Sequence, residues 1–360
     1  MVTFENGEVA SAKLTGFALI NGNGDGGGMR IINSNPTLLN IRIVNNSGSP
    51  AGIYCSNTSS PIINDVVIAN NNGDGLYVVS SSPILTRVSI RDNIGTGLYI
   101  TGNIGSFGIP VLTMSESNIL RNSSANYGGG IRIADGSVRN CLFNNVNISE
   151  NYAAQRGGGF YSSTGQTQIF TNCTFTKNIA DDYGGAIYGG NNTYINCILW
   201  NNTVGGQGSN IVSQGTVSYS NIQGGWEGEG NIDEDPLFVD AANGDYRLSD
   251  YSPAIGAGTA TGAPTTDIDG NPRPNPVGSS PDMGSYENAL GSPLLPPAPT
   301  NLAATVGNSV VNLSWTGNDY VTSYSVYRST TSGSGFTAIA TGLSTTSYQN
   351  TGLTNETTYY

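Results

Sequence analysis

The sequence predicts an all-β protein: a right-handed parallel β-helix with a C-terminal cap, followed by a partial β-sandwich. The composition and two repeating patterns lead to this prediction. Glycine accounts for 50 of the 360 residues, and charged residues make up only 11%. Because glycine and asparagine are poor helix formers, long helices are not expected. The patterns instead indicate short strands that recur along the chain, as in a solenoid.

The first pattern is an apolar residue, any residue, a second apolar residue, two further residues and an asparagine. Its asparagines are separated by 25, 22, 29, 29, 27 and 24 residues, and they are Asn46, Asn71, Asn93, Asn122, Asn151, Asn178 and Asn202. Apolar residues two apart are typical of a strand with one face toward a core. In stacked coils these asparagines would lie above one another, each amide donating to one neighbour and accepting from the other. Asparagine also tolerates the left-handed backbone of a turn.

The second pattern falls between copies of the first and reads Gly, apolar, Tyr or Arg, apolar. It occurs as GIYC at 52, GLYV at 75, GLYI at 97, GIRI at 130, GFYS at 159 and, with alanine first, AIYG at 186. Each repeat therefore holds at least two short strands joined by turns. The leucine-rich consensus is absent, and propeller blades need roughly 40–50 residues per repeat. We therefore predict parallel β-helix coils over residues 1–230.

Residues 231–290 are predicted to cap the last coil, because an open end would expose a sheet edge and the apolar interior. Phe238, Leu248 and Ile255 are the side chains expected to plug that interior. The segment also carries carboxylates suited to Ca²⁺, although their spacing fits no EF-hand loop and solvated turns explain them equally. The calcium candidates are Asp233, Asp235, Asp267 and Asp269.

Motifs within this segment resemble the C-terminal part of secreted bacterial β-helix proteins, the choice-of-anchor or pectin-lyase-like group. They are DPLF at 235, GDYRL at 244, SPAIG at 252, DIDGNPR at 267 and DMGSYE at 282. The resemblance covers roughly residues 1–290. It implies an extracellular or cell-surface protein, although no signal peptide is recognisable in the given sequence, and it implies no particular reaction.

A proline-rich linker at 291–299 precedes a segment of alternating strands, 300–360. The run LTNETTYY resembles the end of a fibronectin type III module, with Leu353 and Tyr359 at the end-of-loop and tyrosine-corner positions. The sequence stops where the sixth strand of such a module would start, so a truncated fibronectin type III-like module is expected. Both chain ends are interpreted as truncations of a longer protein.

Charge and apolar runs exclude several classes of partner. The net charge is −12, with no histidine and only two lysines, so no basic face is expected to bind nucleic acid. No apolar run reaches membrane-spanning length, and we expect a monomer. Four cysteines do not make a disulfide scaffold. Cys173 and Cys197 occupy equivalent places in consecutive repeats, where either a disulfide or two buried free thiols would fit.

Aligning the second pattern places its outward residues in one column, which we call the Tyr/Arg column. Its members are Arg30, Tyr54, Tyr77, Tyr99, Arg132, Tyr161 and Tyr188. Tyrosine rings stack on sugar rings and offer a hydroxyl, while arginine binds carboxylate or sulfate. In the pectin-lyase-like group, polysaccharide lies along such a face, so we expect the column to bind glycan. The alternative is a stack that only stabilises the sheet, because tyrosine is a good strand residue.

A second set of polar residues aligns just upstream of the second pattern: Asn126, Gln155 and Asp182, and Tyr127, Arg156 and Tyr183. A lyase acting on a uronate-containing glycan would neutralise the carboxylate through Arg132 or Arg156 and move protons through Tyr161 or Tyr188. A hydrolase would need paired carboxylates, and Asp181 and Asp182 are adjacent here. No complete catalytic signature is present.

The sequence therefore leaves three functions open: a non-catalytic polysaccharide-binding protein, which we favour, a polysaccharide lyase, and a structural adhesin or stalk segment. A further column of alternating charge, Asp92, Arg121, Glu150 and Lys177, is interpreted as a solvated salt-bridge stripe of little energetic weight.

Overall fold

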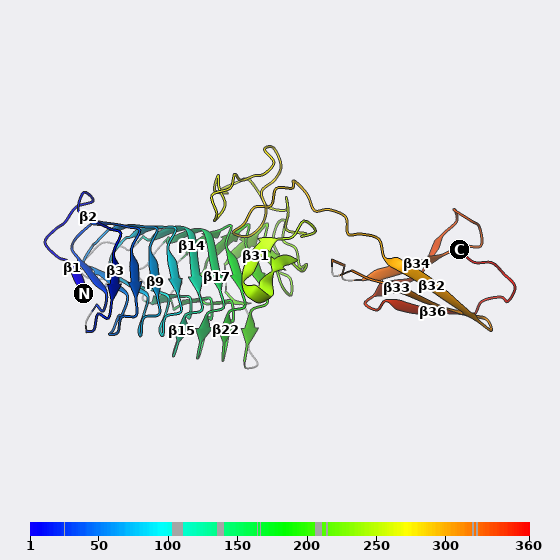
Figure 1. Ribbon diagram of the computed structural model, residues 1–360, viewed down its shortest axis with the longest axis horizontal. Helices are drawn as coiled ribbons and strands as arrows, with labels where there is room; N and C mark the ends of the chain where they lie inside the picture. The colour runs from blue at the N-terminus through cyan, green and yellow to red at the C-terminus, as the bar shows by residue number, and fades with distance from the viewer. Residues whose placement is uncertain are drawn as a thin grey trace. The chain divides into compact units, whose positions relative to one another are not determined.

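The computed structural model forms two compact units, Met1–Pro293 and Leu294–Tyr360. Each unit has sheets of its own (Figure 1). The structure describes residues 1–24, 26–102, 111–134, 140–163, 165, 167–205, 211–213, 215–318, 320–321 and 323–360. No helix in these ranges is long and apolar enough to cross a membrane.

The first unit is a parallel β-solenoid, as predicted, in which like strands of successive coils lie side by side (Figure 1). The second pattern forms a nine-stranded sheet. Its strands, in spatial order, are β1 (Val2–Phe4), β4 (Met29–Ile32), β7 (Ile53–Ser56), β10 (Leu76–Val79), β13 (Leu98–Thr101), β16 (Ile131–Ala134), β19 (Phe160–Ser162), β23 (Ile187–Tyr188) and β27 (Ile211–Val212). All eight pairings between them are parallel.

The first pattern forms part of a sixteen-stranded sheet, which takes two strands from most coils. Strands of the first pattern are β3 (Ala18–Ile20), β6 (Arg42–Val44), β9 (Val67–Ala69), β12 (Ser89–Arg91), β21 (Thr174–Thr176), β25 (Ile198–Trp200) and β29 (Asn221–Ile222). The strands that precede them in each coil are β2 (Lys13–Thr15), β5 (Thr37–Leu39), β8 (Ile62–Asn64), β11 (Ile84–Thr86), β20 (Ile169–Thr171), β24 (Thr193–Ile195) and β28 (Thr216–Ser218). In β14 (Thr113–Leu120) and β17 (Leu142–Ser149) the two strands are continuous.

Most coils thus hold one more strand than the two patterns indicated. A proline begins this missed strand in three early coils, at Pro36, Pro61 and Pro83, and an apolar residue two positions later faces the core. A fourth position, just after the asparagines, pairs in a short sheet of β15 (Ser123–Ser124), β18 (Tyr152–Ala153), β22 (Ile179–Ala180) and β26 (Thr203–Val204).

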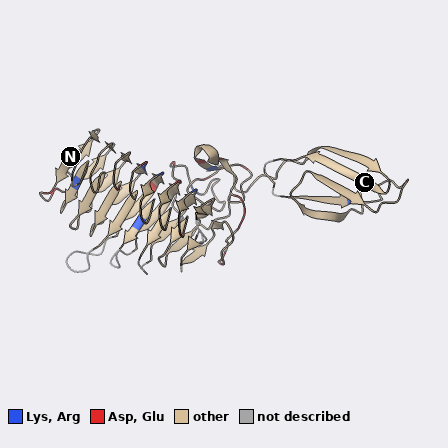
Figure 2. Ribbon diagram, turned by 90° about the horizontal axis from the view of Figure 1, so that it is seen from below, with Lys and Arg blue, Asp and Glu red and all other residues tan. Residues whose placement is uncertain are grey.

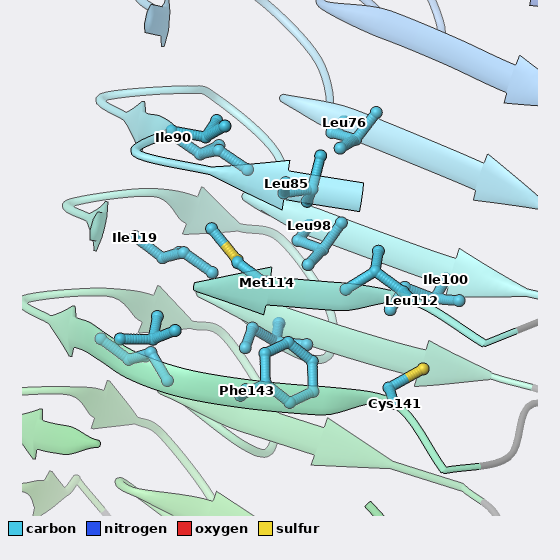
Figure 3. Close-up of a cluster of buried hydrophobic side chains, with 14 of the residues drawn as sticks. Leu76, Leu85, Ile90, Leu98, Ile100, Leu112, Met114, Ile119, Cys141 and Phe143 are labelled. Carbon is cyan, nitrogen blue, oxygen red and sulfur yellow. The ribbon is translucent and has the colours of Figure 1, made fainter. Parts of the chain in front are cut away.

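The interior of the solenoid is a continuous apolar core (Figure 3). Leu76 and Leu98 of the nine-stranded sheet face Leu85 and Met114 of the sixteen-stranded sheet, and all four are fully buried. Toward the later coils aromatic rings take over, with Phe143 and Phe170 stacked at 4.7 Å. Burial of each such side chain contributes about 1.5–3 kcal/mol, so coil-on-coil stacking supplies the core that no single coil has.

The cysteines are free thiols inside this core. Cys173 and Cys197 are therefore two buried free thiols and form no disulfide. Their Sγ atoms lie 3.3 and 3.4 Å from the carbonyl oxygens of Phe143 and Phe170, respectively. Burial raises the pKa of Cys55 to about 12 and that of Cys141 to about 11. They act as small apolar residues.

The predicted asparagine ladder is present and buried. From Asn46 to Asn178, each side-chain Nδ2 donates to the Oδ1 of the asparagine in the next coil at 2.9–3.0 Å, and Asn202 is the last acceptor. Each Oδ1 also accepts the backbone N–H of the preceding ladder position, and each Nδ2 donates to a strand carbonyl of the preceding coil. The amides are therefore satisfied without water.

One detail of that prediction is wrong: the ladder asparagines do not take the left-handed conformation. The residue just before each of them does, for example Asp92 (φ 57°), Arg121 (φ 50°) and Glu150 (φ 59°). The left-handed residue turns the chain so that the following amide points inward. Its own side chain is left outside, which is why the charged column occupies this position.

That charged column is only partly the stripe we expected. Arg121 Nε lies 2.7 Å from Asp92 Oδ1, and Arg121 Nη1 lies 4.0 Å from Glu150 Oε2. Lys177 instead donates to the carbonyl oxygen of Ala241, and Glu150 accepts a 2.6 Å hydrogen bond from Tyr246. The later half of the column thus anchors residues 231–290.

Residues 231–290 cover the side of the solenoid, and the expected plug by Phe238, Leu248 and Ile255 is wrong. These three residues cluster with Ile198, which alternates with the core residue Leu199 and so points outward. Trp226, just before this segment, is partly buried and packs on the core, and Ile232 forms a parallel bridge with Asn221 of the last coil. The segment contains β30 (Phe238–Asp240), a short 3-10 helix η1 (Ala241–Asn243) and β31 (Asp245–Leu248).

A buried ion pair fastens this cover to the solenoid. Arg273 Nε lies 2.7 Å from Glu287 Oε2, with both side chains fully buried. Arg273 Nη1 also donates to Asn145 Oδ1 at 2.5 Å, and Asn145 Nδ2 donates to the carbonyl of Thr266. Because a buried charge is costly without partners, this bonding makes the position of the cover specific.

The second unit consists of two small antiparallel sheets (Figure 1). One contains β32 (Thr300–Gly307), β33 (Val310–Thr316) and β36 (Ser347–Thr351), and the other β34 (Tyr324–Arg328) and β35 (Thr337–Leu343). The hydroxyl of Tyr359 accepts the N–H of Thr354 at 3.0 Å. Ser329 and Tyr360 exchange two backbone hydrogen bonds of 2.8 Å, so the chain at Tyr360 lies against the end of β34.

The asparagine ladder yields a test of the fold. Asn122→Ala removes two donated bonds and the oxygen that accepts two more, which leaves the buried backbone N–H and one side-chain N–H of Asn93 without an acceptor. We expect a loss on the order of 3 kcal/mol in the free energy of unfolding, measured by urea denaturation. Asn126→Ala, at an exposed turn, is the control and should change stability little. Equal stabilities of the two variants would contradict a structural role for the ladder.

Candidate functional site

The Tyr/Arg column is continuous on the outer face of the nine-stranded sheet. Strand register pairs each member with the next, from Arg30 with Tyr54 to Tyr161 with Tyr188. All seven side chains are half-buried. The alternation of each strand sends its neighbours into the core, so the column forms because like positions of successive coils pair in register.

The rings in the column touch one another. Tyr77 and Tyr99 stack with centroids 4.6 Å apart, and Tyr54 lies tilted against Tyr77 at 5.7 Å. The Arg132 guanidinium lies 4.5 Å from the Tyr99 ring, a cation–π contact that continues the stack. Tyr161 and Tyr188 are nearly parallel at 5.6 Å. The outer face of the Tyr/Arg column, which we call the ledge, is therefore a row of aromatic rings in contact, with arginine side chains among them.

A second row lies beside the later part of the column. Tyr127, Arg156 and Tyr183 pair as neighbours in successive coils. Tyr127 stacks on Tyr161 at 4.6 Å, and Arg156 Nη1 donates to the Tyr188 hydroxyl at 2.8 Å. The structure thus brings together four of the five catalytic candidates, Arg132, Arg156, Tyr161 and Tyr188.

Glycines in the left-handed conformation allow the two rows to meet. Gly128 has φ 67°, and a Cβ there would lie 2.6 Å from the Cβ of Arg132. Gly157 repeats this one coil later, at φ 71° and 2.7 Å from the Cβ of Tyr161. A residue with a side chain at these turns would push the second row away from the first.

The fifth catalytic candidate, Asp182, is exposed in the turn before Tyr183. Its neighbour Asp181 accepts a 2.7 Å hydrogen bond from the hydroxyl of Tyr152. Because Asp181 is engaged in this way, the two aspartates do not form the matched carboxylate pair that a hydrolase would use. Nearby, Gln155 donates to Asn126 at 3.4 Å, as their alignment suggested.

The surroundings of the column tyrosines raise the pKa values of two of their phenols. Burial, with smaller effects of Tyr99 and Tyr54, raises the pKa of Tyr77 to about 12. Burial and then Tyr127 raise the pKa of Tyr161. Both phenols therefore stay neutral near pH 7 and can donate and accept hydrogen bonds.

Sequence reasoning missed Asp74, a carboxylate three residues before Tyr77. Burial raises its pKa, while the N–H of Thr96, at 2.8 Å from Oδ1, and the charge of Arg132 oppose the shift. The available signal was the sequence DGLYV, in which an acid stands where other coils have Ala51, Thr96 or Gly129.

Few positions along the chain are charged (Figure 2). Arg132 in the column and Arg156 in the row beside it carry positive charge on this face. The Nε atoms of Arg132 and Arg156 are buried and have no hydrogen-bond partner among the described residues. Their guanidinium groups rest on tyrosine rings, at 4.5 Å from Tyr99 and 4.9 Å from Tyr188. This part of the ledge suits a ligand that offers acceptors as well as apolar faces.

The calcium candidates lie away from this face, in turns. Asp233 and Asp235 accept backbone N–H groups of Gly224 and Leu237 at 3.0 and 2.9 Å. Buried Asp267 accepts N–H groups of Asp269, Asn271 and Glu287, while Asp269 itself is exposed. Within the described ranges, no three or more Asp, Glu, Cys or His side chains are grouped to hold a metal ion. Calcium at these positions stays an untested expectation.

Comparison with known proteins supports the fold over part of the chain. Residues 2–106 match the family described as "Right handed beta helix region", in agreement with the predicted winding. The crystal structure of pectate lyase Pel9A aligns over 75% of this chain and 69% of its own, at 15% sequence identity and a TM-score of 0.49.

Two curated relatives match over a short stretch. They are amylopullulanases of Thermoanaerobacterium saccharolyticum and Thermoanaerobacterium thermosulfurigenes, 40% and 38% identical over 60 residues, or 17% of this chain. The chain spans 5% and 3% of the length of these two proteins.

The raised pKa of Tyr77 predicts a pH dependence of stability. In the unfolded chain the phenol loses its proton near pH 10, whereas in the folded chain it does so near 12. The contribution of Tyr77 is therefore complete below pH 10 and lost as pH rises from about 10 to about 12. Thermal melting across this interval should show a shallower decline for Tyr77→Phe. The phenol of Tyr286, in the cover, also has a pKa of about 12, so Tyr286→Phe should likewise make the decline shallower. Superimposable curves for wild type and Tyr77→Phe would refute the shift.

Proposed function

We propose that this chain is a non-catalytic polysaccharide-binding segment of an extracellular or cell-surface protein, and that the ligand lies along the Tyr/Arg column. The observation that carries the proposal is the unbroken register of the column, with rings in contact from Tyr54 to Tyr99 and from Tyr161 to Tyr188. Parallel strands repeat every ~4.8 Å, so the ledge offers a contact at each coil to an extended chain.

The chemistry of the ledge supports a carbohydrate ligand. Half-buried tyrosine rings present apolar faces and edges with a hydroxyl at the rim, which suits the CH groups and hydroxyls of a sugar. Arg132 and Arg156 add donors for ring substituents or acidic groups. The relatives named amylopullulanases are in keeping with a carbohydrate-related role, although they share only a short stretch with this chain.

The second unit fits the same setting. Its two antiparallel sheets, with the Tyr359 hydroxyl bonded to the N–H of Thr354, are in keeping with part of a fibronectin type III-like module. Tyrosine-to-backbone bonds of this kind close the corner of such sandwiches. In this proposal the module is a spacer, the β-helix is the binding element, and the chain acts as a monomer.

Polysaccharide lyase activity is the second candidate, favoured by one observation. The Tyr188 hydroxyl accepts a hydrogen bond from Arg156, and the Tyr188 ring stacks on the ring of Tyr161. One cation and two tyrosines, the kinds of group that β-elimination would use, are therefore neighbours. Arginine would neutralise the uronate carboxylate, and a phenol would move the C5 proton or protonate the leaving oxygen. Release of unsaturated uronate from polygalacturonate or alginate, abolished by Tyr188→Phe, would establish this activity; without such release, the binding role stands alone.

The binding proposal is tested by affinity electrophoresis through gels that contain pullulan, amylopectin, xylan or polygalacturonate. Tyr77→Ala and Tyr161→Ala each remove a stacking platform, and we expect retardation by the bound polysaccharide to weaken about tenfold. Tyr327→Ala, an exposed strand tyrosine of the second unit, is the control and should behave as wild type. Thermal melting verifies that each variant is folded.

If no polysaccharide retards the wild type, or if the column variants bind as well as the control, the column is only a structural stack. The adhesin or stalk interpretation would then be the correct one.

A further inference from the structure

A hollow of about 480 Å³ lies beside Tyr188, the last tyrosine of the column. Its wall includes Ser163, Gly190, Asn191 and Ser213 as well as the Tyr188 side chain. It adjoins the ledge without being part of the predicted column, and a volume of this size is within the range of small-molecule sites.

The hollow lies where the strand of this coil ends early. β10 and β13 continue for two residues past the column tyrosine, as Val78–Val79 and Ile100–Thr101, whereas β23 ends at Tyr188 itself. Gly189 and Gly190 follow it in the left-handed conformation, at φ 80° and 77°. A Cβ on Gly189 would lie 2.0 Å from the carbonyl oxygen of Ser162. Glycine is thus required at position 189, and Gly190 after it adds no side chain to the wall of the hollow.

The lining has the chemistry of a site for an uncharged polyol. It combines one aromatic side chain, that of Tyr188, with serine hydroxyls, the Asn191 amide and backbone groups of three glycines. No Asp, Glu, Lys or Arg is among the described residues that line it. The Tyr188 hydroxyl accepts its hydrogen bond from Arg156, so its own O–H is oriented to donate elsewhere. Arg156 reaches the rim at the Tyr188 hydroxyl but is not among the lining residues, so an acidic sugar inside the hollow has no charged partner among the described residues of its wall. A neutral hexose finds a ring and several hydrogen-bonding partners.

We propose that this hollow is a subsite for one neutral hexose unit and that it fixes the position of the polysaccharide at the Tyr188 end of the column. The inference rests on the proposed function, because the subsite matters only if a glycan occupies the column. The hollow nevertheless has its own walls, so its affinity for a single sugar is separable from the affinity of the column for a polymer.

The test uses ligand-observed saturation-transfer NMR on the full chain with glucose, galactose, mannose and glucuronate as single-sugar probes. At least one neutral hexose should give a signal, and glucuronate should give none. Ser163→Trp and Asn191→Trp introduce a large side chain from two exposed rim positions, and each should reduce the hexose signal at least tenfold. Ser60→Trp, an exposed serine of an early coil, is the matched control and should leave the signal unchanged.

Tyr77→Ala separates this inference from the proposed function. It should keep the hexose signal while polysaccharide retardation weakens, because Tyr77 lies four coils away from Tyr188 along the column. The inference is overturned if no neutral hexose gives a signal, if glucuronate binds as well, or if both tryptophan variants bind like Ser60→Trp. If the wild type gives the expected hexose signal but no polysaccharide retards it in electrophoresis, the hexose subsite is supported and polysaccharide binding by the column is rejected.

Discussion

The buried asparagine ladder is the interaction on which the rest of the solenoid depends. Each ladder amide makes side-chain bonds to both neighbouring coils and satisfies backbone groups at a turn that water does not reach. A slip of one residue would place an amide in the apolar core and an apolar side chain in the turn, at a cost of several kcal/mol per coil. The ladder therefore sets the register between coils, and the apolar core supplies most of the cohesion.

This register is what turns a pattern of single tyrosines into a surface. Once the coils cannot slide, Tyr54, Tyr77 and Tyr99 must lie in line, and their rings touch with no adjustment of the backbone. A ledge held by strands on a packed core loses little conformational freedom when a ligand binds, which favours affinity. At the later end of the column, β23 ends at Tyr188, and the hollow lies beside the two glycines that follow.

The cover formed by residues 231–290 is attached to the solenoid without any repeat of its own. It lies over outward-facing residues of the later coils, and its attachment depends on a few polar contacts: Arg273 with Glu287 and Asn145, Tyr246 with Glu150, and Asn172 with the backbone of Asp282 and Gly284. Burial and the neighbouring Glu287 raise the pKa of Asp282 to about 7. The cover leaves the Tyr/Arg column uncovered, so the two faces of the solenoid are free to have separate roles.

The sequence by itself determined the coils, the ladder and the membership of the column, because in a parallel solenoid a neighbour in space is a neighbour at one repeat in sequence. Translation along the axis maps Asn93 onto Asn122 and Tyr77 onto Tyr99, and periodicity alone reveals both pairs. Contacts between segments with no common period were decided only by the tertiary structure. The place of Phe238, Leu248 and Ile255 on the outer face, the bond from Arg156 to Tyr188, the proximity of Asp74 to Arg132 and the hollow beside Gly189 belong to this group. These features depend on which side of a coil a non-repeating segment contacts and on how far side chains extend between rows. The spacing of residues along the sequence determines neither of these.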